Sequence, residues 1–471
     1  MEARNAPRIE QDNLGAREIP EAAYYGIHTI RAMENFAVSG RVVNPHMIYS
    51  MVTVKKAAAL AHLKLSTYPL EIAKSIVQAC DDILAGRYME QFSVDALQGG
   101  AGTSTNMNVN EVIANRAIEL LGGQLGDYSL VHPIDHVNRN QSTNDVYPTA
   151  LRIAAIGLVR KLSQAFASLQ EALQEKEHEF ADVLKLGRTE LMDALPMMAG
   201  QGFGAYAKAI ARDRWRIYKV EERLREINIG GTAIGTGINA PLKYTFYITE
   251  LLQDLTGYGL ARSEYPMDST QNMDVFVEVS GLLKAASVNL LKISNDLRLL
   301  GSGPIGGFGE LELPAVQVGS SIMPGKVNPV IPEMIGMVAM RVIANDTAVT
   351  MAAASGQLEL NAFMPLIADT LLESLEILDH AVRLFEERCV RGIHMREDHC
   401  RAMVENSAVL ATALVSYIGY EKSAWVAKRA MQEGKTVRQV MMEEQVLPEE
   451  EIDRILSIYQ VTKPGVPGKQ G

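Results

Sequence analysis

The sequence predicts an all-α fold built around a bundle of long helices. Apolar residues recur every three or four positions over stretches of more than 25 residues, a spacing that places them on one face of a helix. In the stretch 268–300 this stripe consists of Val279, Leu282, Leu283, Ala286, Leu290, Ile293, Leu297 and Leu300. Strand patterns are scarce. Stripes of this width need partner helices, and we expect other copies of the chain to supply some of them.

The same spacing predicts helices along most of the chain. The long ones span 47–84 with a break at Pro69, 146–181, 196–227, 268–300, 330–354 and 364–391. Another helix is expected to begin near Asn110, after a run of small residues. Beyond Arg396 the composition is more charged, and shorter amphipathic helices are expected at 405–417, 421–432 and 448–459. Disorder is expected from Thr462.

The length of the chain predicts more than one domain. It has 471 residues, which is more than a single hydrophobic core usually organises. We expect an N-terminal mixed and helical domain over 1–141 and a long-helix domain over 142–395. A small helical domain with a disordered tail is expected over 396–471.

Charge and composition narrow the classes of partner. The net charge of −11 argues against nucleic acid and against an anionic membrane surface. No apolar run approaches the ~20 residues of a membrane-spanning helix, and the N-terminus lacks the apolar segment of a signal peptide. Three cysteines without CxxC spacing are typical of a reducing compartment. We therefore expect a cytoplasmic protein.

One loop, the stretch 319–329 with the sequence GSSIMPGKVNP, concentrates the polar chemistry. Its glycines let the backbone turn freely, and its prolines stop any helix. Its polar side chains are Ser320, Ser321, Lys326 and Asn328. Small residues with free backbone N–H groups suit anion binding, and the lysine adds a positive charge for a carboxylate or phosphate.

Two simpler interpretations of this loop are weaker. A phosphate-binding P-loop has four residues between its glycines and a Ser or Thr after its lysine. Here five residues separate Gly319 from Gly325, and Val327 follows the lysine. A solvated glycine-rich linker would explain a single Gly-Ser-Ser tripeptide, but not the whole string.

The complete string resembles the signature loop of the fumarase/aspartase superfamily. Three more segments resemble that family in the same order: 98–112, 141–145 and 185–194. The Ser-Thr pair at Ser142 and Thr143 resembles the aspartase branch, because fumarases tend to have Ser-Ser there. The resemblance covers about residues 7–459.

The resemblance implies a three-domain fold with a central long-helix bundle, assembled as a homotetramer with shared active sites. It implies elimination of ammonia from L-aspartate to give fumarate, with a small dicarboxylate or amino acid as substrate and no cofactor or metal. Alternatives are a fumarate hydratase, a lyase for an N-substituted aspartate, and a non-catalytic structural relative.

The resemblance also implies roles for individual residues. Ser320 is expected to be the base that removes the Cβ proton. The groups expected to hold the β-carboxylate as it becomes an enediolate are Thr103, Ser142, Thr143, Ser321 and the N–H groups of Ile322 and Met323. Those expected to hold the α-carboxylate are Thr189, Lys326 and Asn328. Asn144 is expected to contact the amino group.

Two positions depart from the family pattern. Glu190 stands where histidine is most common, and Ile305 stands where many relatives carry arginine. The family's histidine interacts with a glutamate that corresponds to Glu333, so two carboxylates are expected to meet here. We expect this pair to favour a substrate that carries an amine.

Two further segments have residues of the kind found in ligand sites, but neither is expected to be one. His132, Asp135 and His136 have the ligand types of a metal site. The resemblance places this segment beside a metal-free site. The glycine-rich stretch 230–237 lacks the GxGxxG spacing that a dinucleotide needs after a strand.

Overall fold

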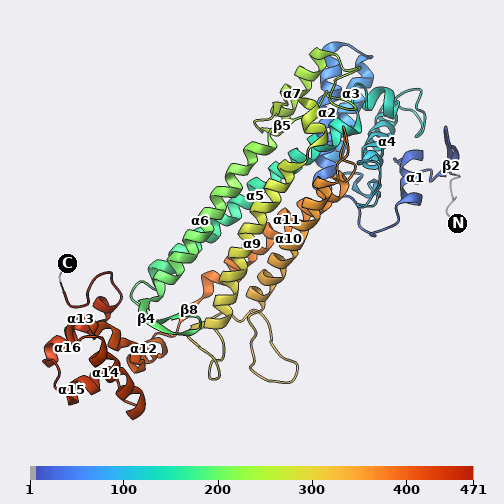
Figure 1. Ribbon diagram of the computed structural model, residues 1–471. Coiled ribbons are helices and arrows are strands. Elements are labelled where there is room, and N and C mark those ends of the chain that lie inside the picture. The colour runs from blue at the N-terminus through green and yellow to red at the C-terminus, as the bar shows by residue number, and fades with distance from the viewer. Residues whose placement is uncertain (1–6, 470–471) are drawn as a thin grey trace. The chain divides into compact units, whose positions relative to one another are not determined.

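The computed structural model describes residues 7–469, and it confirms the all-α class (Figure 1). Within these residues, β structure consists of four two-stranded sheets and two isolated bridges. The described chain divides into two compact units, each assembled from several stretches. Unit 1 comprises 7–164, 215–287 and 339–379, and unit 2 comprises 165–214, 288–338 and 380–469. The domain boundaries at 141 and 395 remain predictions.

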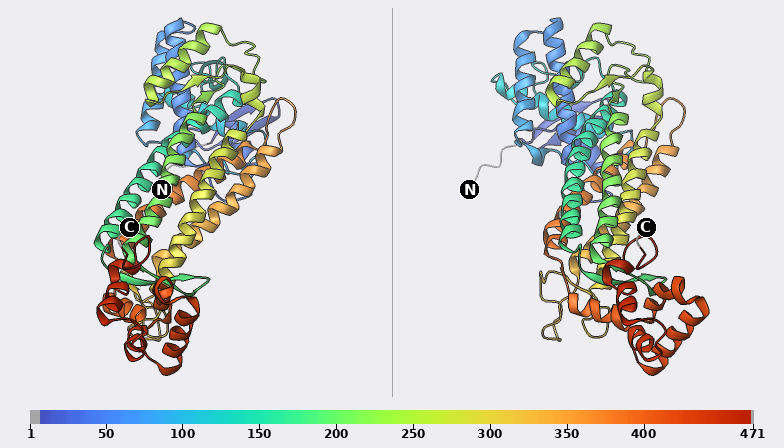
Figure 2. Two further views of the ribbon diagram at one scale, coloured as in Figure 1. Left: turned by 60° about the vertical axis from the view of Figure 1, so that its left-hand side comes forward. Right: turned by 90° about the vertical axis from the view of Figure 1, so that its left-hand side faces the viewer.

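Unit 1 begins with an antiparallel hairpin of β1 (Arg8–Asp12) and β2 (Gly15–Ile19). Its shorter helices are α1 (Ile27–Asn35), α2 (Pro45–Leu65), α3 (Leu70–Leu84), α4 (Thr103–Leu120), α7 (Leu242–Thr256) and α8 (Pro266–Gln271). The two-residue strands β5 (Glu226–Ile227) and β6 (Ala261–Arg262) pair in parallel. Helix α2 packs against both α3 and α7, as the views of Figures 1 and 2 agree.

Five long helices contribute residues to both units. They are α5 (Thr143–Glu179), α6 (Ala199–Leu224), α9 (Asp274–Leu300), α10 (Val330–Ala354) and α11 (Met364–Arg388). The predicted helices at these places are confirmed, with ends that shift by a few residues. Most of the stripe predicted on α9 is buried, namely Val279, Leu283, Ala286, Leu290, Ile293 and Leu297. The spacing therefore identified the face that packs.

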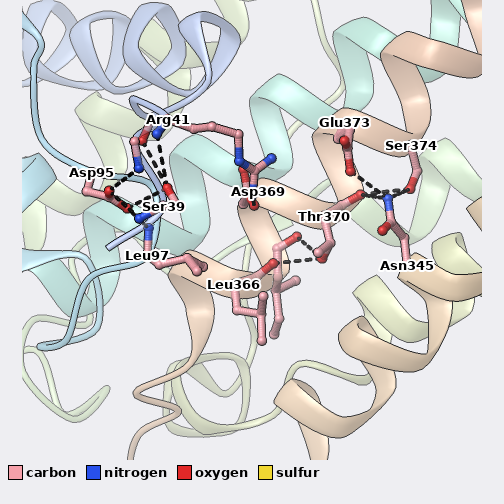
Figure 3. A network of polar contacts seen from close by, with 12 residues as sticks. Ser39, Arg41, Asp95, Leu97, Asn345, Leu366, Asp369, Thr370, Glu373 and Ser374 are labelled. Carbon is pink, nitrogen blue, oxygen red and sulfur yellow. Dashed lines mark hydrogen bonds and ion pairs between the residues drawn. The ribbon is translucent and has the colours of Figure 1, made fainter. Parts of the chain in front are cut away.

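A polar network fixes α10 and α11 to each other inside unit 1 (Figure 3). The amide nitrogen of Asn345 donates to Glu373 Oε2 at 2.8 Å and to Ser374 Oγ at 3.0 Å. Farther along α11, Asp369 accepts from Arg41 at 2.6 Å. Asn345 is almost fully buried, so these bonds satisfy groups that water cannot reach. They hold two long helices in one register.

Unit 2 carries the antiparallel hairpin of β3 (Leu184–Thr189) and β4 (Met192–Met198), and the short pair β7 (Leu311–Glu312) and β8 (His394–Met395). Its C-terminal helices are α12 (Glu397–Asn406), α13 (Val415–Ile418), α14 (Tyr420–Glu433), α15 (Val437–Glu443), α16 (Glu449–Ile455) and α17 (Ile458–Val461). A cluster that includes Leu414, Val426, Val440 and Ile452 forms their core.

The C-terminal helices differ from the prediction in detail. The helix expected over 405–417 is interrupted at Ser407, whose side chain caps the 3₁₀ turn that follows. Helix α15 was not expected, and it begins with a capping box between Thr436 and Gln439. In the tail, where disorder is expected, the Tyr417 hydroxyl donates to the Pro467 carbonyl at 2.5 Å.

The prediction that a helix begins near Asn110 is wrong. Helix α4 begins at Thr103, because Gly102 adopts a φ of 91° as its N-cap. A Cβ on Gly102 would lie 2.2 Å from the ring of Tyr147, so only glycine fits there. The small residues form the turn that starts the helix.

None of the helices in the part of the chain that the structure describes is long and apolar enough to cross a membrane.

Candidate active site

The loop 319–329 has no regular secondary structure, and most of it is exposed. Its two ends are tied together: the Gly319 N–H donates to the Lys326 carbonyl at 3.0 Å, and the Asn328 amide donates to the Gly319 carbonyl at 2.7 Å. A Cβ on Gly319 would lie 2.5 Å from that carbonyl oxygen of Lys326. The loop is therefore a closed turn whose middle part, including the Lys326 side chain, faces outward.

Ser320 lies at the start of this turn, and its Oγ accepts two backbone hydrogen bonds. The Met323 N–H donates to it at 2.9 Å and the Ile322 N–H at 3.2 Å. Backbone N–H groups that converge on one oxygen favour a negative charge on it. In this conformation the two N–H groups serve the serine itself, whereas the sequence led us to expect them at the substrate carboxylate.

The β3–β4 hairpin carries Thr189 and Glu190 to an exposed position in unit 2. Thr189 pairs with Met192 across the hairpin. Between them Glu190 and Leu191 have φ values of 55° and 64°, the conformation of a tight hairpin turn. Both predicted site residues are exposed, so the turn presents them outward.

A buried carboxylate anchors the base of this hairpin. Glu310 is completely buried, and its two oxygens lie 2.5 Å from Arg188 Nη1 and 3.2 Å from Lys185 Nζ. The Arg188 guanidinium also covers the ring of Phe308. Sequence reasoning missed Glu310, because nothing in its neighbourhood distinguishes it from an exposed glutamate.

A cavity of about 440 Å³ lies beside the hairpin within unit 2. Its walls include Lys185, Arg188, Glu190, Phe203, Lys292 and Asp296. Apolar side chains line much of the remaining wall, so the cavity combines charged groups with an apolar body.

The two positions that depart from the family pattern lie in unit 2. Among the described residues of one chain, no hydrogen bond or ion pair joins Glu190 to Glu333. Glu333 instead lies 3.7 Å from Arg298. Ile305 is 94% exposed, so its apolar side chain has no packing role within the chain.

The other predicted site residues belong to unit 1 and lie at helix N-termini. Thr103 is the first residue of α4, and its hydroxyl donates to the Gly100 carbonyl at 2.8 Å. Thr143 is the first residue of α5 and is buried. Most N–H groups of these first turns already have acceptors, such as Gln98 Oε1 for Thr105 and Ser142 Oγ for Asn144. The helix dipole still favours a negative charge at both positions.

The run 142–144 is held by hydrogen bonds that use specific atoms. Ser142 Oγ accepts from the Asn144 N–H at 3.2 Å, and Thr143 Oγ1 accepts from the Asn106 amide at 3.0 Å. The Asn144 amide donates one of its two hydrogens to the Ala233 carbonyl at 2.7 Å. Both hydroxyls act as acceptors here, which leaves their hydrogens available to a ligand.

Asp145 ties this run to the glycine-rich segment 230–237. Its carboxylate accepts from the N–H groups of Ser142 at 2.9 Å, Gly230 at 3.0 Å and Thr232 at 2.9 Å. Complete burial raises the pKa of Asp145 to about 6. The glycine-rich segment 230–237 is therefore held against the run 142–144 through Asp145.

A hollow of about 560 Å³ opens beside Ser142 in unit 1, between the segment 138–142 and the segment 232–239. The two histidines near it use their Nδ1 atoms within their own segment. His132 Nδ1 accepts from the Ile134 and Asp135 N–H groups, and His136 Nδ1 accepts from the His132 N–H. Among the described residues, no three His, Cys, Asp or Glu side chains are placed to hold a metal.

Lys55 is a second residue that sequence reasoning missed. It lies in α2, it is completely buried, and it donates to Asn138 Oδ1 at 2.8 Å and Gln141 Oε1 at 3.0 Å. Burial lowers the pKa of Lys55 to about 7. The available signal was its position: it falls on the apolar face of α2, in line with Met51 and Ala58.

The structure thus groups the predicted residues into two sets. Thr103, Ser142, Thr143 and Asn144 belong to unit 1. The set in unit 2 is Thr189, Glu190, Ser320, Ser321, Ile322, Met323, Lys326, Asn328 and Glu333. The unit 1 set consists of hydroxyls and an amide, and the unit 2 set adds one lysine and the two carboxylates of Glu190 and Glu333. The hydroxyls, amides, N–H groups and the lysine suit carboxylate binding.

Comparison with known protein families agrees with this chemistry. The family described as Lyase matches residues 15–344, and the family described as Fumarase C C-terminus matches residues 410–463. The chain therefore belongs to this lyase family within the fumarase/aspartase superfamily, and it is an enzyme of the lyase class.

Individual relatives match over nearly their whole length. The aspartate ammonia-lyase of a Bacillus species is 46% identical over 98% of this chain and 99% of its own. The aspartate ammonia-lyase of Escherichia coli K12 is 45% identical over 99% of this chain and 98% of its own.

Two solved structures are similar in fold. The fumarate lyase:delta crystallin of Brucella melitensis bound to cobalt has a TM-score of 0.94 and 49% identity, covering 97% of this chain and 100% of its own. The class II fumarase of Schistosoma mansoni has a TM-score of 0.92 and 34% identity, covering 97% and 99%.

Proposed function

We propose that this enzyme is an ammonia-lyase that converts L-aspartate into fumarate and ammonia. The observation that carries the proposal is the closed turn around Ser320, in which two N–H groups converge on the serine oxygen. The names of the full-length relatives at 45–46% identity support the choice of aspartate.

In the proposed reaction Ser320, as its alkoxide, removes a proton from Cβ of aspartate. The electron pair of the broken C–H bond moves into the β-carboxylate and gives an enediolate. Serine is a weak base, so its alkoxide needs stabilisation by positive charge and by N–H donors. The hydrogen bonds from the Ile322 and Met323 N–H groups to Ser320 Oγ are suited to stabilise the alkoxide. When the enediolate collapses, the C–N bond breaks, the C=C bond of fumarate forms and ammonia leaves.

The remaining residues are proposed to bind the substrate. Donors for the β-carboxylate are Ser142, Thr143 and Ser321. Thr103 and the loop N–H groups are proposed to join them by exchanging their present acceptors, the Gly100 carbonyl and Ser320 Oγ, for the carboxylate. Donors for the α-carboxylate are Thr189, Lys326 and Asn328. Asn144 is proposed to contact the amino group through its Oδ1, because an ammonium group only donates hydrogen bonds. Preorganised donors of this kind usually supply most of the rate enhancement.

We propose that the enzyme is a homotetramer whose active sites combine residues of different subunits. Helix α10 supports assembly: Met337, Met340 and Met351 are each at least 60% exposed in a single chain. A face of exposed methionines on a long helix is suited to burial against another copy. The sites are proposed to need no cofactor.

Ultraviolet absorbance of fumarate tests the proposal directly. Purified enzyme should produce fumarate from L-aspartate and release ammonia in equal amount. Production of fumarate from malate instead would identify a fumarate hydratase, as the similarity to the Schistosoma mansoni fumarase allows. Turnover only with N-substituted aspartates would identify the third alternative. No turnover with any of these substrates would favour a structural relative.

A further inference from the structure

The Lys55 amino group lies in the interior of unit 1, next to the segment that leads into the proposed substrate-binding residues 142–144. It is 0% exposed, and its two hydrogen-bond acceptors are the side-chain oxygens of Asn138 and Gln141. A buried ammonium without hydrogen bonds would be strongly destabilising. These two hydrogen bonds therefore fix the segment 138–141 to Lys55 on α2.

The lysine determines which way the Asn138 amide faces. Lys55 Nζ donates to Asn138 Oδ1 at 2.8 Å, so the Asn138 amide presents its oxygen to the lysine. Asn138 Nδ2 donates to the Gln141 carbonyl at 3.2 Å, which agrees with an amide oxygen that faces Lys55. Asn138 Oδ1 also accepts a second hydrogen bond, from Asn106 Nδ2 at 3.1 Å.

The orientation of the Asn138 amide also determines the hydrogen bond that Thr143 accepts. Because Asn138 offers an oxygen, Asn106 must turn its Nδ2 toward it. The same nitrogen donates to Thr143 Oγ1 at 3.0 Å. A hydroxyl that accepts in this direction keeps its own hydrogen free to donate elsewhere.

We propose that Lys55 is a positioning residue that directs the Thr143 hydroxyl hydrogen toward the substrate carboxylate, acting through Asn138 and Asn106. This inference rests on the proposed function, in which Thr143 contacts the substrate. A carboxylate only accepts hydrogen bonds, so a threonine that spent its hydrogen on Asn106 would contribute nothing to it. Lys55 prevents that reversed arrangement without touching the substrate.

A double-mutant cycle tests the relay. Lys55→Met should lower kcat/KM for aspartate by about tenfold or more in the wild-type background. In a Thr143→Val background, where no hydroxyl remains to be directed, the same change should cost less than about threefold. Equal losses in both backgrounds would overturn the proposal, because they would mean that Lys55 acts independently of Thr143.

A matched control distinguishes this effect from a general loss of structure. Lys56 is the next residue on the same helix, and it forms an ion pair with Asp81 at 2.5 Å. Lys56→Met should leave kcat/KM within about twofold of wild type. The thermal midpoint and the oligomer size of every variant are measured alongside.

Asn106→Asp provides a second test that does not depend on removing a buried lysine. The new side chain has nearly the same shape, but it accepts from the Thr143 hydroxyl and so reverses that bond. Asn106→Asp should therefore lower kcat/KM by about tenfold or more, whereas Asn406→Asp, at an exposed position of α12, should leave it within about twofold of wild type. Wild-type activity of Asn106→Asp would overturn the relay. If Thr143→Val itself had wild-type activity, the failure would lie in the proposed role of Thr143.

Discussion

The backbone N–H of Met323 donates to Ser320 Oγ at 2.9 Å, within a turn that the Gly319 and Lys326 backbones close. A serine oxygen that is already held by N–H donors needs little rearrangement to carry a negative charge. This relationship makes Ser320 the residue whose removal is most informative.

Ser320→Ala is expected to abolish elimination while substrate binding persists, because the base acts only in the chemical step. Steady-state kinetics and equilibrium binding of aspartate measure the two effects separately. Ser355→Ala, which changes an exposed serine on another segment, serves as the control and should retain activity. If Ser320→Ala retained more than about a tenth of the wild-type kcat, a loss of only ~1.4 kcal/mol, the assignment would be wrong.

Subunit mixing tests the shared active site. Ser320→Ala and Thr189→Ala chains are each expected to be inactive as pure tetramers. After subunit exchange, hybrid tetramers should regain part of the activity, because some sites would combine an intact Ser320 from one chain with an intact Thr189 from another. Mass spectrometry confirms the exchange. Hybrids that stay inactive after confirmed exchange would count against sites shared between subunits.

Glu190→Gln tests the proposed preference for an amine-bearing substrate. A carboxylate attracts the ammonium group of aspartate, so the variant should lose one to two kcal/mol of transition-state stabilisation with aspartate, about one charge-assisted hydrogen bond. Malate turnover, if present, should change less. Glu359→Gln, at another exposed position, is the control. Equal losses with both substrates, or none with aspartate, would remove Glu190 from substrate selection.

Glu310→Gln should destabilise the hairpin that carries Thr189. Glu310 is the buried anion between Lys185 and Arg188, and removing one partner of a buried ion pair typically costs about 3–5 kcal/mol. Glu312→Gln is a matched control two residues away, with a 67% exposed side chain, and should cost under about 1 kcal/mol. Chemical unfolding measures both. Similar unfolding free energies for the two variants would show that the buried pair does not stabilise the fold.

Glu111 should make stability depend on pH. Its carboxyl group is buried and accepts from the Gly26, His28 and Thr29 N–H groups. Desolvation raises its pKa to about 7, above the value of ~4.3 expected in the unfolded chain. The folded state therefore binds more protons between these values, and the contribution of Glu111 to stability is lost as pH rises from ~4.3 to 7.

The difference in unfolding free energy between wild type and Glu111→Gln isolates this contribution. It should fall as the pH is raised from ~4.5 to 7, with a slope of at most ~1.4 kcal/mol per pH unit. A difference that is constant across this range, or that grows with pH, would contradict the raised pKa.

The sequence by itself determined the long helices, because residues buried on one face of a helix recur every three or four positions. The stripe on α9 predicted both the helix and the face that packs. The string around Ser320 identified the polar loop and the family, because its residues are contiguous. Local patterns of this kind can be read without knowledge of distant contacts.

Other features were decided by tertiary structure. The start of α4 depends on Gly102 fitting against Tyr147, which lies far along the chain. The same is true of two buried charges: Glu310 is anchored by Arg188, and Lys55 is satisfied by Asn138 and Gln141. Local spacing shows only that Lys55 falls on the apolar face of α2. The hydrogen bonds that make the burial of a charged residue tolerable come from segments distant in sequence. The residues behind the proposed site therefore emerged only when the folded chain brought those partners together.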